Sequence, residues 1–186
     1  MSALTQRRLF TVGDYYRMAE TCILSANDRV ELISGEIVEM SPIGSRHAAC
    51  VKRLVHWLSA ALGEQAVLSV QNPVRLDDFS EPEPDVSVLR PRADFYAAAH
   101  PGPEDVLWLI EVSDSSLVFD RRVKLPLYAA HGIPEVWVVS LVEDLVEVFR
   151  NPSAKKYAQS RKLRRGARLT PAAFPTVELD VDAVLG

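Results

Sequence analysis

Apolar runs in the second half of the chain predict two buried strands joined by a helix. Residues 106–112 are almost wholly apolar, which is typical of a central strand covered on both faces. Helical character follows over 119–130, and residues 135–141 form a second apolar run. Because Pro126 removes a backbone hydrogen bond, we expect a kink or a restart within the helical stretch. The strand–helix–strand order predicts a right-handed parallel crossover.

The first half of the chain predicts one long amphipathic helix among shorter elements. Over residues 45–62 apolar side chains recur at helical spacing, Ser45 can cap the start, and Gly63 ends the pattern. Polar and apolar residues alternate on both sides of Ser34-Gly35, which predicts a β-hairpin. The other predicted elements are helices over 11–21 and 93–99 and strands over 66–70, 74–76, 85–89 and 145–150.

These elements predict an α/β fold, with an α+β mixed sheet and flanking helices, in one domain over residues 1–186. A chain of 186 residues can bury a sizeable hydrophobic core but is too short for two large domains. Apolar residues make up 48% of the chain and charged residues 25%, as in ordinary globular proteins. No internal repeat, linker or low-complexity tract divides the sequence.

Targeting and cysteine patterns bear on the compartment. No apolar run reaches the roughly 18 residues that a membrane-spanning helix needs. Arg7 and Arg8 are not followed by an apolar stretch typical of a secretory signal. The two cysteines, Cys22 and Cys50, lack the spacing of a disulfide framework or a structural zinc site. We therefore expect a cytoplasmic protein without a membrane partner.

Charge is distributed unevenly along the chain. The formal net charge is −4, yet residues 150–168 contain eight Lys or Arg and no acid, which leaves 13 basic and 25 acidic residues elsewhere. This basic segment can follow the phosphates of a nucleic acid. Alternatively, it is a solvated hairpin or loop rich in charge.

Acidic residues fall at the ends of two predicted strands. Asp85 opens one strand, and Glu111 lies near the end of the next, where a buried carboxylate needs a cation, hydrogen bonds or a proton. If the strands are neighbours, both carboxylates converge, and oxygen ligands favour Mg²⁺ or Mn²⁺ over Zn²⁺. Lys124, in the crossover helix, could reach the same end of the sheet. This combination suits metal-assisted hydrolysis of a phosphodiester.

Four blocks of sequence carry a resemblance to a known family. The blocks "RVELISGEIVEMSPIGSRH", "EPEPDVSVL", "LIEVSDSSL" and "DRRVKLPLYAAHGIPEVWVV" resemble the Uma2 (DUF820) proteins, a branch of the PD-(D/E)XK nuclease superfamily. The resemblance covers residues 11–149. It implies a restriction-endonuclease-like core with flanking helices and β-hairpins, and a metal-dependent endonuclease with Asp85 and Glu111 as metal ligands.

The resemblance also implies roles for further residues. Where the general superfamily motif has a lysine this chain has Ser113, and Uma2-like sequences move the lysine to the following helix, which matches Lys124. Glu31 matches an additional acidic metal ligand, and Gln71 also matches the family pattern. We expect His47, Gln71 and Ser113 to contact the substrate. His47, at the start of the long helix, could orient a phosphate or a water.

Each candidate residue also has a purely structural interpretation. Glu111 could form a buried salt bridge, Lys124 could pair with Asp120 one helical turn away, and Glu31 could be an exposed strand residue. Tyr128 could simply pack. The remaining alternatives are a turn or cap for Asp85, a strand-edge hydrogen bond for Gln71, a helix-start hydrogen bond for His47, hydrogen bonds behind the site or a helix cap for Ser113, and core positions for Trp108 and Trp137.

Three functional hypotheses follow from the sequence. The first is a Mg²⁺- or Mn²⁺-dependent endonuclease that cleaves DNA. The second is a catalytically inactive nucleic-acid-binding or assembly module on the nuclease fold, since a fold does not imply a function. The third is an interaction protein whose acidic cluster is a structural ion-pair network. A homodimer is expected by analogy with the fold and because dimers are the commonest assembly.

Overall fold

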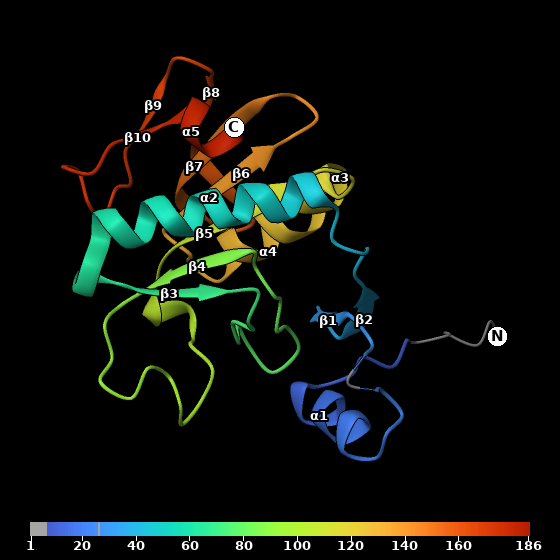
Figure 1. The fold of residues 1–186 in the computed structure, drawn as a ribbon. Helices are drawn as coiled ribbons and strands as arrows, with labels where there is room; N and C mark the ends of the chain where they lie inside the picture. The colour runs from blue at the N-terminus through green and yellow to red at the C-terminus, as the bar shows by residue number, and fades with distance from the viewer. Residues whose placement is uncertain (1–6, 26) are drawn as a thin grey trace.

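A six-stranded mixed sheet forms the centre of the fold in the computed structural model, which describes residues 7–25 and 27–186 (Figure 1). The strands lie in the order β3-β4-β5-β6-β7-β8. Only β5 and β6 pair in parallel, which confirms the predicted parallel crossover. The bounds are Val67–Val70 for β3, Val86–Leu89 for β4, Val106–Ser113 for β5, Glu135–Ser140 for β6, Leu145–Ser153 for β7 and Lys156–Arg164 for β8.

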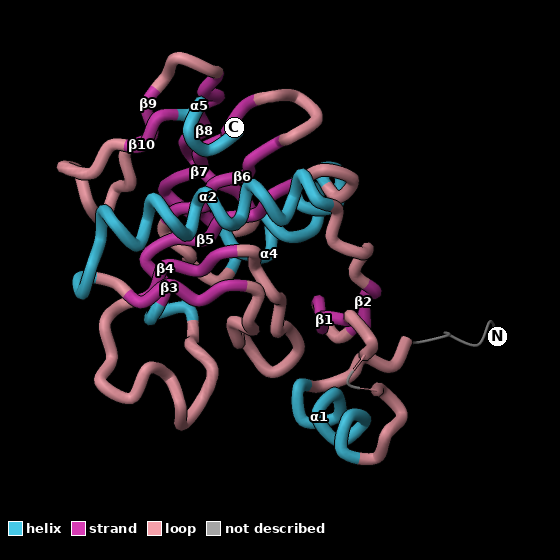
Figure 2. The backbone as a smooth tube through the Cα atoms, viewed as in Figure 1, coloured by secondary structure: helices cyan, strands magenta, loops and turns pink. Residues whose placement is uncertain are grey.

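Helices cover both faces of this sheet. The helix α2, Ser45–Leu62, runs across one face (Figure 2). It packs there in one apolar cluster with Trp108 and Trp137. The helix α4, Leu125–Ala130, contributes to a second cluster on the other face. Smaller elements are α1 (Val12–Glu20), β1 (Val30–Ile33), β2 (Glu36–Glu39), η1 (Gly63–Gln65), η2 (Pro103–Asp105), β9 (Arg168–Leu169), β10 (Leu179–Asp180) and α5 (Val181–Leu185).

The long helix and the N-terminal hairpin form as predicted, except for the residue that caps the start of the helix. The helix α2 begins at Ser45, but its N-cap is Gly44, which has no side chain to bond the first turn, so Ser45 is not the cap. Gly63 ends the helix with φ +50°. In the turn between β1 and β2, Ser34 and Gly35 both have positive φ, as the tight turn of a hairpin requires.

The crossover between β5 and β6 is divided into three consecutive helical segments. It consists of α3 (Leu117–Phe119), a π-helical turn η3 (Asp120–Lys124) and α4. Pro126 lies at the start of α4, so a new helical segment begins at the proline, which confirms one of the two predicted alternatives. The irregularity therefore lies before the proline, in a wide turn of the kind found frequently at functional sites.

Two predicted short elements are wrong. Residues 74–76 form no strand, because Val74 donates its N–H to Pro82 in an irregular segment. Residues 93–99 form turns rather than a helix, since Phe95 and Tyr96 both have positive φ. The Asp94 carboxylate accepts the N–H of Tyr96, a local bond that competes with helix formation.

None of the helices in the described ranges has both the length and the apolar character needed to cross a bilayer. Residues 1–6, which belong to the stretch considered for a secretory signal, lie outside the described residues.

Candidate active site

The pairing of β4 with β5 brings Asp85 beside the end of β5. The two strands are antiparallel, with Val86 opposite Ile110, so Asp85 lies level with Glu111. The N–H of Val112 donates to Asp85 Oδ2 at 2.8 Å. This bond joins the residue before β4 to β5, a contact that a local turn or cap does not account for. The predicted neighbouring strands therefore place both acids at one end of the sheet.

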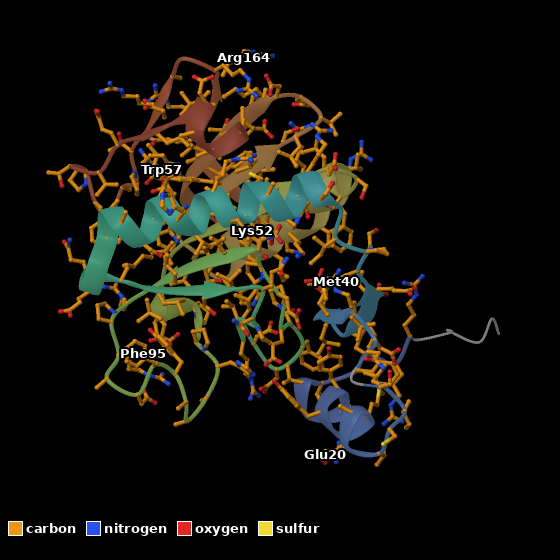
Figure 3. All side chains as sticks on the ribbon, in the orientation of Figure 1. Glu20, Met40, Lys52, Trp57, Phe95 and Arg164 are labelled. Carbon is orange, nitrogen blue, oxygen red and sulfur yellow. The ribbon has the colours of Figure 1, made fainter. Side chains whose placement is uncertain are left out.

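A cavity of about 420 Å³ opens at this end of the sheet. Its lining includes Met40, which is labelled in Figure 3. The predicted site residues that line it are Glu31, His47, Gln71, Asp85, Glu111 and Lys124, contributed by β1, α2, the segments after β3 and before β4, β5 and the π-turn η3. Residues distant in the sequence thus share one cavity wall.

A buried ion-pair cluster forms one side of the cavity. Lys124 Nζ lies 3.0 Å from Glu31 Oε2 and 3.3 Å from Glu111 Oε1. The side chains of all three residues are at most 7% exposed. The alternatives of an exposed Glu31 and of a Lys124–Asp120 pair are therefore wrong. Glu111 does form the buried salt bridge that was one alternative for it, and it faces the cavity as well.

Burial and mutual charge shift the pKa values in this cluster. Burial raises the pKa of Glu111 to about 8, although the nearby Lys124 ammonium acts in the opposite direction. Burial alone would lower the pKa of Lys124, but the carboxylates of Glu111 and Glu31 outweigh it and raise that pKa. Lys124 is therefore firmly charged, whereas burial favours the neutral, protonated form of Glu111.

Donors from three elements orient Asp85. His47 Nε2 lies 3.0 Å from Asp85 Oδ2, and Gln71 Nε2 donates to Oδ1 at 3.2 Å. Together with the N–H of Val112, these groups fix both carboxylate oxygens. The hydrogen bond with Asp85 raises the pKa of His47. His47 and Gln71 thus contact the candidate ligand and also face the cavity.

Ser113 lies behind the cavity wall rather than on it. Its hydroxyl is fully buried and donates to Asp120 Oδ2 at 2.6 Å, and Ser116 donates to the same oxygen at 2.7 Å. Asp120 lines the cavity, whereas Ser113 is absent from its described lining. The geometry matches the alternative in which Ser113 supplies hydrogen bonds behind the site.

Two residues at the site were not identified from the sequence. Tyr128 is fully buried, and its hydroxyl donates to Glu111 Oε1 at 2.5 Å. Its position one helical turn after Lys124 was the available signal. Glu83 lines the cavity and donates its N–H to Glu31 Oε2, and burial together with the Glu31 charge raises the pKa of Glu83. The available signal in the sequence was its position, since this acidic residue lies two residues before Asp85.

The donor chemistry of the cavity fits a hard divalent cation. Its acidic groups supply carboxylate oxygens, which Mg²⁺ and Mn²⁺ prefer. The ammonium of Lys124 already lies between Glu31 and Glu111 and balances negative charge at that position. Across residues 7–25 and 27–186, no three His, Cys, Asp or Glu side chains are grouped closely enough to hold a metal by themselves. The agreement between the cavity and a divalent cation therefore concerns the type of ligand atom and its charge, not a preformed group of three ligands.

Comparisons with known proteins identify a family and a similar fold. The model of the Uma2 family, described as "Putative restriction endonuclease", matches residues 12–182. A solved structure, described as "a putative nuclease belonging to DUF820" from Anabaena variabilis ATCC 29413, is similar with a TM-score of 0.71. The similarity covers 95% of this chain and 97% of that chain.

At 16% sequence identity, the similarity to this solved structure concerns the fold. It confirms the predicted α/β mixed sheet with flanking helices. A search of curated proteins found no match. The family match spans most of the sequence, including all the predicted site residues. The chain therefore belongs to the Uma2 family.

Proposed function

We propose that this protein is a divalent-metal-dependent endonuclease that hydrolyses phosphodiester bonds of DNA. The observation that carries this proposal is the convergence of Glu31, Asp85, Glu111 and Lys124 on one cavity at the end of the sheet. The description of the Uma2 family supports the same class of enzyme. Negative charge that develops on a phosphoryl group would be stabilised by the buried ammonium and by a cation held by the carboxylates.

The residues divide the work as follows. Asp85, Glu111 and Glu31 would hold Mg²⁺ or Mn²⁺, which when bound polarises the phosphoryl group and lowers the pKa of a water. Lys124 keeps its charge next to the carboxylates and stabilises negative charge that develops on the phosphate. His47 and Gln71 orient Asp85 and present polar atoms to the substrate.

Ser113 acts indirectly in this proposal. It donates to Asp120 and so steadies a carboxylate of the cavity wall from behind. The basic segment of β7 and β8 supplies cations for the phosphates of the nucleic acid outside the cavity.

A cleavage assay tests the proposed function. Supercoiled and linear DNA are incubated with the protein and Mg²⁺, Mn²⁺ or EDTA, beside the variants Asp85→Asn and Glu111→Gln. We expect metal-dependent cleavage by the parent and a loss of about 100-fold or more in both variants, since each removes a ligand charge. The control Glu36→Gln neutralises an exposed carboxylate on β2 and keeps full activity.

Circular dichroism shows whether each variant is folded. The proposal fails if the parent cleaves neither DNA nor RNA with any of these metals and if the Asp85 and Glu111 variants bind metal as well as the parent does.

The second candidate is a nucleic-acid-binding or assembly module without catalysis. It is favoured by Ser113 in place of the general motif lysine and by Lys124 held between two carboxylates. This candidate predicts DNA binding that is insensitive to EDTA, weakened strongly by salt and not followed by cleavage. An interaction protein with a structural ion-pair network would bind neither metal nor DNA.

We also propose a homodimer, by analogy with the fold and the frequency of twofold assemblies. Light scattering coupled to size exclusion tests this proposal against the chain mass of 20.7 kDa. A particle of one chain mass across the concentration range would contradict it.

A further inference from the structure

One oxygen of Glu111 carries all of the contacts described for its carboxylate. Tyr128, on α4, donates its hydroxyl to Oε1 at 2.5 Å, and Lys124 Nζ lies 3.3 Å from the same oxygen. Among residues 7–25 and 27–186, no hydrogen-bond donor reaches Oε2. Glu111 thus has one oxygen held from the α4 side of the sheet and one oxygen left over.

The two partners of this bond differ in their access to the cavity. Glu111 lines the cavity, whereas Tyr128 is fully buried in the apolar cluster between α4 and the sheet. Tyr128 therefore contacts the carboxylate from behind. Its ring is held by packing, so the hydroxyl is a fixed point on which the carboxylate is oriented.

The need to satisfy a buried hydroxyl does not by itself explain this partner. A buried tyrosine requires an acceptor, and a backbone carbonyl is sufficient. Tyr157 shows this within the same chain, since its hydroxyl donates to the carbonyl of Ile133 at 2.9 Å. At Tyr128 the acceptor is instead the carboxylate of a candidate metal ligand.

We propose that Tyr128 is a positioning residue that fixes Glu111 so that its second oxygen faces a divalent cation in the cavity. This inference rests on the proposed function, because Glu111 is there a metal ligand. Hydrogen bonds to a ligating carboxylate orient it, and their loss typically lowers metal affinity about 10- to 100-fold. Tyr128 itself contacts neither the cation nor the substrate.

The test is a titration with Mn²⁺, followed by the electron paramagnetic resonance signal of the free ion. The compared proteins are the parent, Tyr128→Phe, the matched control Tyr157→Phe and Glu111→Gln. Both tyrosine variants lose one hydroxyl from a buried or partly buried hydrogen bond. We expect Tyr128→Phe to weaken Mn²⁺ binding by about 10-fold or more, and Tyr157→Phe to leave it unchanged.

A second hydroxyl-free variant, Tyr128→Met, decides the question if Tyr128→Phe does not give a native circular dichroism spectrum. Its flexible side chain refills irregular space. Parent-like Mn²⁺ affinity in a folded Tyr128 variant, together with weakened binding in Glu111→Gln, overturns the role of Tyr128 and leaves the metal site standing. A parent that binds no Mn²⁺ overturns the proposed metal dependence, and the role of Tyr128 with it.

Discussion

Glu31, Glu111 and Lys124 form a cluster of charges that is almost closed to water. Taking each charge out of water is costly, and the cluster persists because the ammonium lies within about one hydrogen-bond length of both carboxylates. Its members therefore depend on one another: removing the cation leaves two carboxylates facing each other in a buried position. The same three side chains therefore contribute both to the stability of the fold and to the proposed chemistry.

The variant Lys124→Met tests this dependence. Removing one partner of a buried ion pair costs about 3–5 kcal/mol of the free energy of unfolding, because the remaining charges are uncompensated. Urea denaturation measures the loss. The control Lys162→Met removes an exposed lysine whose partner, Glu147, keeps Arg121 at 2.6 Å, so we expect a loss below about 1 kcal/mol. Equal losses in the two variants would contradict the buried cluster.

Part of this site could be predicted from the sequence. The meeting of Asp85, Glu111 and Lys124 could be predicted, because strand ends and the following helix fall at one edge of a sheet. The partner of Tyr128 could not be predicted in the same way. A spacing of four residues places Tyr128 beside Lys124 on a helix, but it does not specify which strand residue the hydroxyl reaches. That contact depends on how α4 packs on β5.

At the scale of elements, the two ends of α2 show how local chemistry sets a helix. Gly44 at its start and Gly63 at its end both have open space where a Cβ would lie. They differ in backbone: Gly44 has φ −74°, which any residue adopts, whereas Gly63 has φ +50° with ψ −126°. The same substitution should therefore act in opposite directions at the two ends.

Gly44→Ser should stabilise the protein by about 0.5–1 kcal/mol, because the hydroxyl can accept a free N–H of the first turn and the unfolded chain loses entropy. Gly63→Ser should destabilise it by about 1–3 kcal/mol, since only glycine adopts that conformation without strain. Thermal unfolding of the two variants measures both effects. A loss of stability in Gly44→Ser would contradict the described cap.

Regular elements were easier to predict than irregular ones. Residues 45–62 repeat apolar side chains over five turns, so both ends of α2 were predicted to the residue. The π-turn η3 was not predicted, because one wide turn barely changes the apolar pattern of a short helix. Residues 74–76 alternate like a strand, but their N–H groups bond to a loop rather than to a neighbouring strand.

At the scale of the whole molecule, positive charge collects in the basic segment of residues 150–168, most of which lies on the hairpin of β7 and β8. Four basic residues of this segment pair with carboxylates, as Lys162 does with Glu147. The other four have no carboxylate within salt-bridge distance among the described residues; they are Lys155, Lys156, Arg161 and Arg164. Arg164, labelled in Figure 3, ends β8 at the edge of the sheet. These four basic side chains suit contacts with the phosphates of a nucleic acid.

The triple variant Lys156→Gln, Arg161→Gln and Arg164→Gln should weaken DNA binding. Each lost phosphate contact reduces the slope of log affinity against log salt by about 0.9. Fluorescence anisotropy across a salt series measures this slope. The control Arg17→Gln, Arg75→Gln and Arg92→Gln neutralises three ion-paired arginines elsewhere and should leave the slope unchanged. Equal slopes for the two triple variants would exclude the hairpin as the contact surface.

The position of β8 at the rim of the sheet has another consequence. An outermost strand exposes unpaired backbone groups on which a strand of another molecule can dock, and this is a common route to aggregation. Such docking between two copies of the chain would bring the lysine and arginine side chains of one β8 against those of the other. Repulsion between like charges therefore disfavours extension of the sheet at β8. Two copies of the chain would have to associate through some other surface.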